Sequence, residues 1–285
     1  MSKSHVSKSH AKFGRSWWPA HILVWGYAVL LAVPLYYFVA SSFKSNDAIF
    51  GSPLAPPASL GLDNFTTAFR TAGLGTAVVN SALVTVVALA LTLGLAVPAA
   101  FALARSEGRA ASVIEKVFSL GFLIPTFAAL FPTFLLAAAA GLFHTRTFMV
   151  LLLPATALPL SVVILVQFMR TIPKEMEEAA RMDGASTFAV LRHVYTPMCL
   201  PGIATVLLLN FLSFWNEYLY SLVLIGPDPD LRTVQVALPT LKSVTGTDYG
   251  VLTAGTVLTL VPVWLVYTVL QKRMQTALVS GAVKM

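Results

Sequence analysis

Six long apolar runs constrain this chain more than any other feature of its sequence. They cover approximately residues 19–40, 78–104, 117–140, 148–169, 200–225 and 251–270, and none contains a Lys or Arg. Crossing roughly 30 Å of hydrocarbon takes about 20 apolar residues in a helix, which satisfies all its backbone amides internally. The runs are apolar on every face, whereas helices of a soluble bundle carry polar stripes. The pattern predicts an all-α integral membrane protein with six transmembrane helices.

The composition indicates a single membrane domain and no separate soluble domain. Hydrophobic residues make up 57% of the 285 residues and charged residues only 11%, too few to cover a soluble surface. We expect a cytoplasmic tail at 1–18, a six-helix domain at 19–271 and a second cytoplasmic tail at 272–285. No segment outside the runs is long enough to fold by itself, so any catalytic engine must belong to other chains.

The basic residues predict the orientation of the chain. With the N-terminus inside, the inner segments hold 14 of the 19 Lys and Arg residues, and such residues stay on the cytoplasmic side in short loops. Both termini are therefore expected in the cytoplasm. The net charge of +7 then reflects topology and contact with anionic headgroups, not nucleic-acid binding.

The inner loop at 170–199 is the most informative connection and predicts two short helices. Pro173 suits a first helical turn, and Gly184 suits the left-handed residue that ends a helix. Ser186 or Thr187 can cap a second helix, which Pro197 brings to a close. Acidic residues favour the positive end of the first helix, namely Glu175, Glu177 and Glu178.

This loop resembles the signature of permease subunits in binding-protein-dependent ABC importers. That signature reads Glu-Ala-Ala, three residues, Gly, nine residues, Ile, one residue, Leu-Pro. The residues that match it at the required spacing are Glu178, Ala179, Ala180, Gly184 and Pro197. Val194 stands for the Ile, and Thr196 departs from the Leu, which weakens the tail of the motif but not its core.

The physical chemistry of the loop agrees with a docking role. Small side chains at Ala179 and Ala180 allow close backbone approach, Gly184 gives a flexible terminus, and Glu178 can pair with a basic group on a partner. The expected ATPase-coupling residues are Glu178, Ala179, Ala180, Asp183, Gly184 and Pro197. The alternative is a solvated amphipathic connector, because acidic first turns are common in such segments.

The resemblance extends over most of the chain, to the maltose-type sugar importers and the shorter of their two permease subunits. It is carried by PLYYFVASSFKS at 34–45, FWNEYLYSLVL at 214–224 and the ending LVSGAVKM. It implies a type I importer permease fold in the bacterial inner membrane. It also implies a second related permease, a solute-binding protein outside, and two ATPase subunits that hold ATP and Mg²⁺, leaving no cofactor here.

Glu217 is the one Asp, Glu, Lys or Arg side chain within the six runs. An ionised carboxylate facing lipid is costly, so it should face protein or water. One interpretation places it on a sugar pathway with its neighbours, so that the candidate pathway residues are Trp215, Asn216, Glu217 and Tyr218. The other is a structural hydrogen bond between helices.

No phosphate-cradling loop, zinc-protease motif or nucleophile elbow occurs in the sequence, so no catalytic residue, metal site or nucleotide site is expected on this chain. Two other classes remain open. A self-sufficient carrier driven by an ion gradient would need ionisable residues or broken helices at mid-membrane. A membrane-embedded enzyme would need a catalytic constellation.

Overall fold

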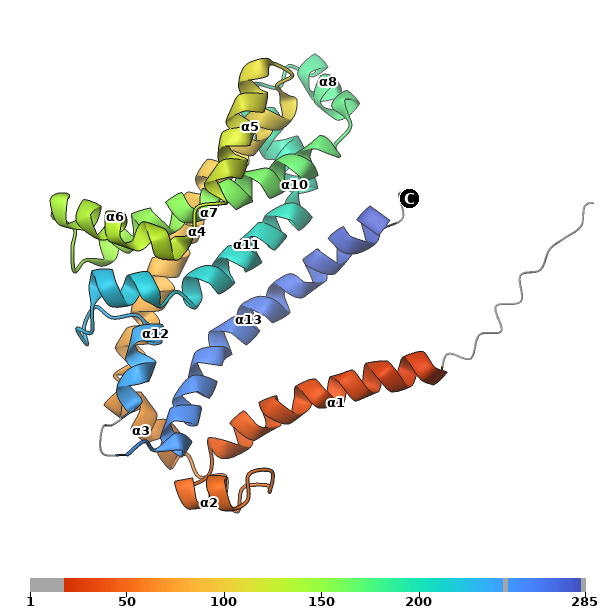
Figure 1. Ribbon diagram of the computed structural model, residues 1–285. Helices are drawn as coiled ribbons and strands as arrows, with labels where there is room; N and C mark the ends of the chain where they lie inside the picture. Colours follow the sequence, from red (N-terminus) through yellow and green to blue (C-terminus); the bar gives the residue numbers. More distant parts are fainter. Residues whose placement is uncertain (1–17, 243–245, 283–285) are drawn as a thin grey trace, which may run out of the picture.

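The computed structural model describes residues 18–242 and 246–282, and their regular secondary structure is entirely helical (Figure 1). Most of the expected tail at 1–18 lies outside the described residues. Of the expected tail at 272–285, the backbone is described to residue 282 and the side chains are not. The last helix continues through residue 271 without a break.

Four apolar runs form continuous helices, each long enough to span a membrane. They are α1 (Trp18–Ser41), α4 (Leu74–Arg105), α7 (Arg146–Arg170) and α13 (Tyr249–Ala282). Each contains at least one internal proline, which removes a backbone donor without ending the helix. Proline is tolerated in this way inside membrane helices.

The third run forms two helices that meet at a sharp bend. It divides into α5 (Arg109–Gly121) and α6 (Thr126–Ala139), which meet at 97°. Pro125 precedes α6 in an extended conformation and disfavours a helical conformation at Ile124. Hydrogen bonds from Leu123 and Ile124 to carbonyls three residues back close the end of α5 as a tight turn.

The fifth run is also broken. Its helix, α11 (Leu200–Trp215), ends well before residue 225, and the chain resumes in the π-helix η2 (Ser221–Ile225). On its other side α11 bends by 76° from a helical stretch made of α9 (Thr187–Val190), the π-helix η1 (Leu191–Tyr195) and α10 (Thr196–Met198). Four continuous helices and two bent pairs are together compatible with the expected six spans.

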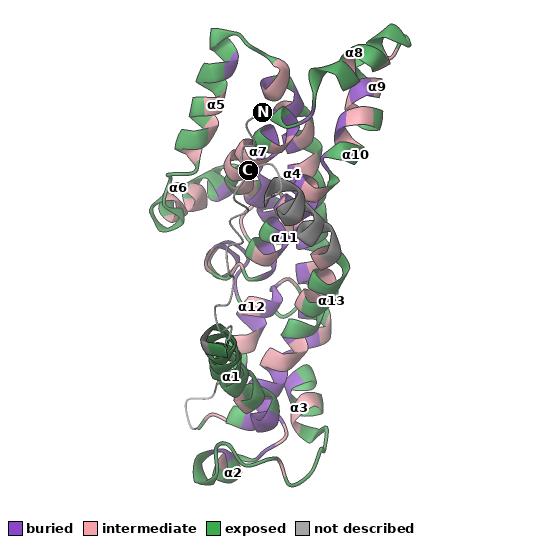
Figure 2. Ribbon diagram, turned by 90° about the vertical axis from the view of Figure 1, so that its right-hand side faces the viewer, coloured by how far each residue is buried: buried purple, intermediate pink, exposed green. Residues whose placement is uncertain are grey.

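The spans pack around α4 and α7, which make the most extensive contact in the fold. Helix α11 contacts α4, α7 and α13, and α5 lies on α7. Two buried clusters result: one lies near the outer ends of the spans, and one surrounds the inner ends of α4 and α7. Figure 2 shows this buried stripe along the bundle.

Short helices lie at both ends of the bundle. On the outer side are α2 (Asn46–Gly51), α3 (Asp63–Thr71), α12 (Val234–Ala237) and the 3-10 helix η3 (Leu238–Leu241). The inner end carries α8 (Lys174–Met182), at the opposite end of the molecule from α2 and α3 (Figure 1). Helix α1 diverges from α13, and most of its side chains are exposed.

Candidate functional site

The inner loop contains the projecting amphipathic helix α8. Pro173 immediately precedes it in an extended conformation, one residue earlier than the first-turn position that the sequence predicts. Two carboxylates, Glu175 and Glu177, occupy its first turn, where the helix dipole favours negative charge. None of its residues is buried, and Figure 2 shows it projecting from the bundle.

Gly184 ends this helix in the predicted left-handed conformation, with φ of 82°. Its amide donates to the carbonyl of Arg181 at 3.0 Å, and the amide of Ala185 donates to the carbonyl of Ala180 at 3.0 Å. These bonds satisfy carbonyls that a helix end leaves without partners. The Ser186 hydroxyl then accepts the amide of Ala189 at 3.2 Å and caps the next helix, as the sequence predicts.

The signature residues form an exposed edge on α8. Glu178, Ala179, Asp183 and Gly184 are exposed, and Ala180 is half-buried. Two large apolar side chains of the same loop are also exposed, Met182 by 88% and Phe188 by 68%. An exposed set of small, apolar and acidic groups on a projecting helix suits insertion into a cleft of another protein.

Pro197 lies apart from this edge. Within the loop, the main contacts of α8 are with α9 and η1, whereas Pro197 is exposed in α10. The helical stretch that contains it continues to Met198, and Thr196 before the proline is itself helical, so Pro197 does not end the helix where the sequence predicts. The structure therefore leaves four of the six expected coupling residues exposed on or just after α8, packs Ala180 partly against the inner core cluster, and separates Pro197 from them.

Ion pairs tie the loop to the inner ends of the spans. The guanidinium of Arg170 donates to both carboxylate oxygens of Glu115 on α5, at 3.0 and 2.7 Å. Lys174 donates to Glu107, which follows α4. That hydrogen bond and the positive charge of Lys174 hold the pKa of the Glu107 carboxyl below its usual range.

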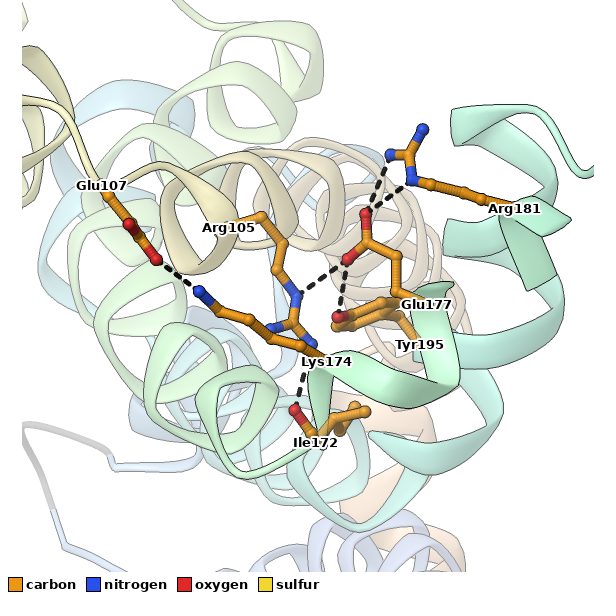
Figure 3. Close-up of polar contacts among 7 residues, drawn as sticks. All are labelled: Arg105, Glu107, Ile172, Lys174, Glu177, Arg181 and Tyr195. Atoms are coloured by element: carbon orange, nitrogen blue, oxygen red, sulfur yellow. Dashed lines mark hydrogen bonds and ion pairs between the residues drawn. The ribbon is translucent and has the colours of Figure 1, made fainter. Parts of the chain in front are cut away.

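Glu177 lies on the inward face of α8. Its carboxylate contacts Arg105 at the end of α4, the Tyr195 hydroxyl and Arg181 one turn along the helix (Figure 3). The Arg105 and Glu177 side chains are only 14% and 15% exposed, respectively. The two consecutive glutamates of α8 therefore point differently: Glu177 faces the fold, and Glu178 is exposed.

The candidate pathway residues divide into two kinds. Trp215 is buried, stacks on Phe211 with ring centroids 5.8 Å apart, and donates its indole N–H to the carbonyl of Thr259 at 3.2 Å. Glu217 accepts the amides of Tyr220 at 2.6 Å and Ser221 at 2.8 Å. Both side chains hold the break after α11 together.

Asn216 and Tyr218 are exposed on the other side of the same break. The side-chain oxygen Oδ1 of Asn216 accepts a hydrogen bond from Gln235 Nε2 at 3.2 Å. Tyr218 lines a cavity of about 540 Å³, together with Gln235, Tyr37 and Tyr249. Aromatic faces beside amide and hydroxyl groups are suited to binding a sugar, whose ring has apolar faces and polar edges.

A known protein family matches this chain over much of its length. Residues 93–280 match the family described as binding-protein-dependent transport system inner membrane component. This chain belongs to that family. It is therefore a multi-pass protein of the bacterial inner membrane, with the fold of an importer permease.

Relatives of this permease align over nearly its whole length. A diacetylchitobiose uptake system permease of Streptomyces coelicolor is 36% identical over 92% of this chain and 87% of its own. A trehalose transport system permease of Mycobacterium tuberculosis is 30% identical over 94% and 97%. A chain of a bacterial ABC transporter that imports alginate superposes with a TM-score of 0.78 at 25% identity, over 95% of this chain and 99% of its own.

Sequence reasoning missed the inward carboxylate of this permease. It assigned partner pairing to Glu178 and gave Glu177 no separate role, although Arg181 follows Glu177 at the i,i+4 spacing of a helical ion pair. That spacing was the available signal. Among the described residues, no group of three or more His, Cys, Asp or Glu side chains is placed to hold a metal ion.

Proposed function

We propose that this permease forms half of the translocation pathway of an ATP-driven importer for a carbohydrate or carbohydrate-like solute. The observation that carries the proposal is the exposed edge of α8, which ends at Gly184 and projects from the cytoplasmic end of the bundle. Small residues at Ala179 and Ala180 allow a partner cleft to approach the backbone, while Glu178 is free to pair with a cation in it.

The energy source is a pair of cytoplasmic ATPase subunits, which bind ATP and Mg²⁺. Closure of this pair moves α8, and the spans follow between inward-open and outward-open arrangements. The chain itself contributes no nucleotide-binding loop, so its part is mechanical. The coupling residues are those of the α8 edge, and Pro197 contributes by shaping the bend before α11.

A second, related permease completes the pathway. The exposure of α1 favours such a partner, because the apolar side chains of this helix lie largely outside the chain's own core. A solute-binding protein outside the membrane delivers the substrate to the outer ends of the spans. The names of related systems support a sugar as the transported solute. Those systems take up diacetylchitobiose, trehalose and alginate.

Asn216 and Tyr218 are the pathway residues that the geometry favours. Tyr218 lines the cavity of about 540 Å³, and exposed Asn216 accepts a hydrogen bond from Gln235, which also lines it. Trp215 is buried, and both carboxylate oxygens of Glu217 are engaged with the backbone or hydroxyl of the following residues. We therefore assign Trp215 and Glu217 to stabilising the break after α11. Asn216 and Tyr218 contact the passing solute.

One reconstitution tests the proposal against an ion-driven carrier. The chain is expressed with its neighbouring subunits, tagged and placed in proteoliposomes with the binding protein outside. Uptake of labelled diacetylchitobiose and trehalose is measured with ATP inside, or with a proton or sodium gradient alone. We expect an ATPase subunit to copurify and uptake to require ATP. Uptake by the isolated chain under an ion gradient would establish the carrier instead.

A further inference from the structure

The inward carboxylate of α8 joins elements that the sequence keeps far apart. Glu177 Oε2 lies 3.2 Å from Arg105 Nε, in an ion pair without hydrogen-bond alignment, and it accepts the Tyr195 hydroxyl at 3.1 Å. Its other oxygen, Oε1, accepts two N–H groups of Arg181 at 2.8 and 3.0 Å. Figure 3 shows all three partners converging on this one side chain.

Arg105 extends the same set of contacts to the spans. It is the last residue of α4, and its Nη2 donates to the carbonyl of Ile172, in the turn between α7 and α8, at 3.1 Å. Its guanidinium carbon also lies 4.5 Å from the centre of the Tyr195 ring. One cation thus contacts the α7–α8 turn, α8 itself and η1 from the end of α4.

Tyr195 completes a cluster with Glu177 and Arg105. It is fully buried at the end of the π-helix η1, and its ring meets Phe101 of α4 edge-on with centroids 4.7 Å apart. A π-turn adds one residue to a helix, which rotates the following side chains by about 100°. Such turns are frequent at functional sites, and here the turn ends at a residue that is hydrogen-bonded to α8 and packed against α4.

We propose that Glu177 is a positioning residue that makes α8, the end of α4 and the π-turn of η1 move as one body. The proposal rests on the function given above and extends it to the transmission of force. The exposed edge of α8 receives the push of the ATPase, and the inward carboxylate passes it to the spans. Without that carboxylate, α8 can move while α4 stays in place.

The loop offers a matched control for this proposal. The pair of Lys174 and Glu107 has the same charges and also joins the loop to the end of α4, but its side chains are 63% and 78% exposed. Exposed ion pairs contribute little, whereas a pair held away from water is costly to break. Glu107→Gln therefore removes the same charge in the same region without disturbing the cluster.

The experiment compares Glu177→Gln, Glu107→Gln and the unmodified chain in the full transporter in proteoliposomes. Spin labels at Glu175→Cys on α8 and Ser106→Cys after α4, both exposed positions, report the distance distribution between these elements. ATP hydrolysis and uptake of labelled diacetylchitobiose are measured on the same vesicles. Uptake per ATP hydrolysed is the quantity that a purely structural role would leave unchanged.

We expect Glu177→Gln to broaden the distance distribution and to lower uptake per ATP by about 2- to 30-fold, the range typical of residues that couple two sites. Glu107→Gln should match the unmodified chain in both. The proposal is overturned if Glu177→Gln leaves both quantities at the control values. If instead no ATPase subunit copurifies with the unmodified chain, the proposed function fails, and the distance measurement still tests the cluster.

A milder variant covers the case in which Glu177→Gln does not reach the membrane. Tyr195→Phe removes only the hydroxyl that donates to Glu177 and keeps the ring against Phe101. It should lower uptake per ATP in the same direction and by a smaller factor. An unchanged ratio in this variant, with an unchanged distance distribution, would also overturn the proposal.

Discussion

Gly184 gives the sharpest test of how α8 engages its partner. With φ of 82°, it occupies a region that side chains other than glycine rarely adopt. A Cβ atom built on it meets no atom of this chain within 4 Å, and the residue is exposed, so alanine there would clash with nothing in this chain. A substitution therefore has two separable effects: backbone strain within this chain, and steric conflict with whatever the exposed edge contacts.

The strain can be bounded from the structure. A residue with a Cβ atom in the left-handed region costs about 1–2 kcal/mol. If the helix end can relax to escape that strain, the docking-competent form falls by a factor of about 5–30. Gly184→Ala and Gly184→Phe share this backbone penalty. Because the surrounding space is open in this chain, any further loss in Gly184→Phe measures the fit against the partner.

The assay is ATP-dependent uptake in proteoliposomes, with copurified ATPase and membrane content measured alongside. We expect Gly184→Ala to lose at most about 30-fold in uptake and Gly184→Phe to lose it altogether. Both should insert normally, because Gly184 lies outside the spans. If Gly184→Phe were no worse than Gly184→Ala, the fit into a cleft would be refuted. Wild-type uptake in both would refute the coupling role of the loop.

Three further predictions concern packing and the break after α11. A Cβ on Gly202 would lie 2.6 Å from the Phe168 ring, so Gly202→Ala should lower the free energy of unfolding by about 1–3 kcal/mol. Gly94 lies in open space, so Gly94→Ala should be neutral or stabilising. Thermal unfolding in detergent measures both variants. Trp215→Phe should cost about 1 kcal/mol through its lost hydrogen bond and keep uptake; lost uptake at normal stability would make Trp215 a pathway residue. Glu217→Ala leaves two backbone amides without their acceptor and should cost about 1–3 kcal/mol for each, and an unchanged unfolding temperature would contradict its capping role.

Much of this protein follows from sequence alone, because the deciding physics is local. Twenty apolar residues in a row favour lipid whatever surrounds them, so the spans and the membrane were predictable. The left-handed end of α8 at Gly184 and the cap at Ser186 were predictable for the same reason, since each depends on a few neighbouring residues.

Only the tertiary structure decided which of two adjacent glutamates faces the fold. Successive residues on a helix point about 100° apart, and Glu177 turns inward because Arg105 and Tyr195 converge there from other elements. Likewise, hydropathy marked residues 200–225 as a span, yet the break after Trp215 appears only once its neighbours are in place. Hydropathy adds up along the chain, whereas the direction of a side chain depends on partners distant in sequence.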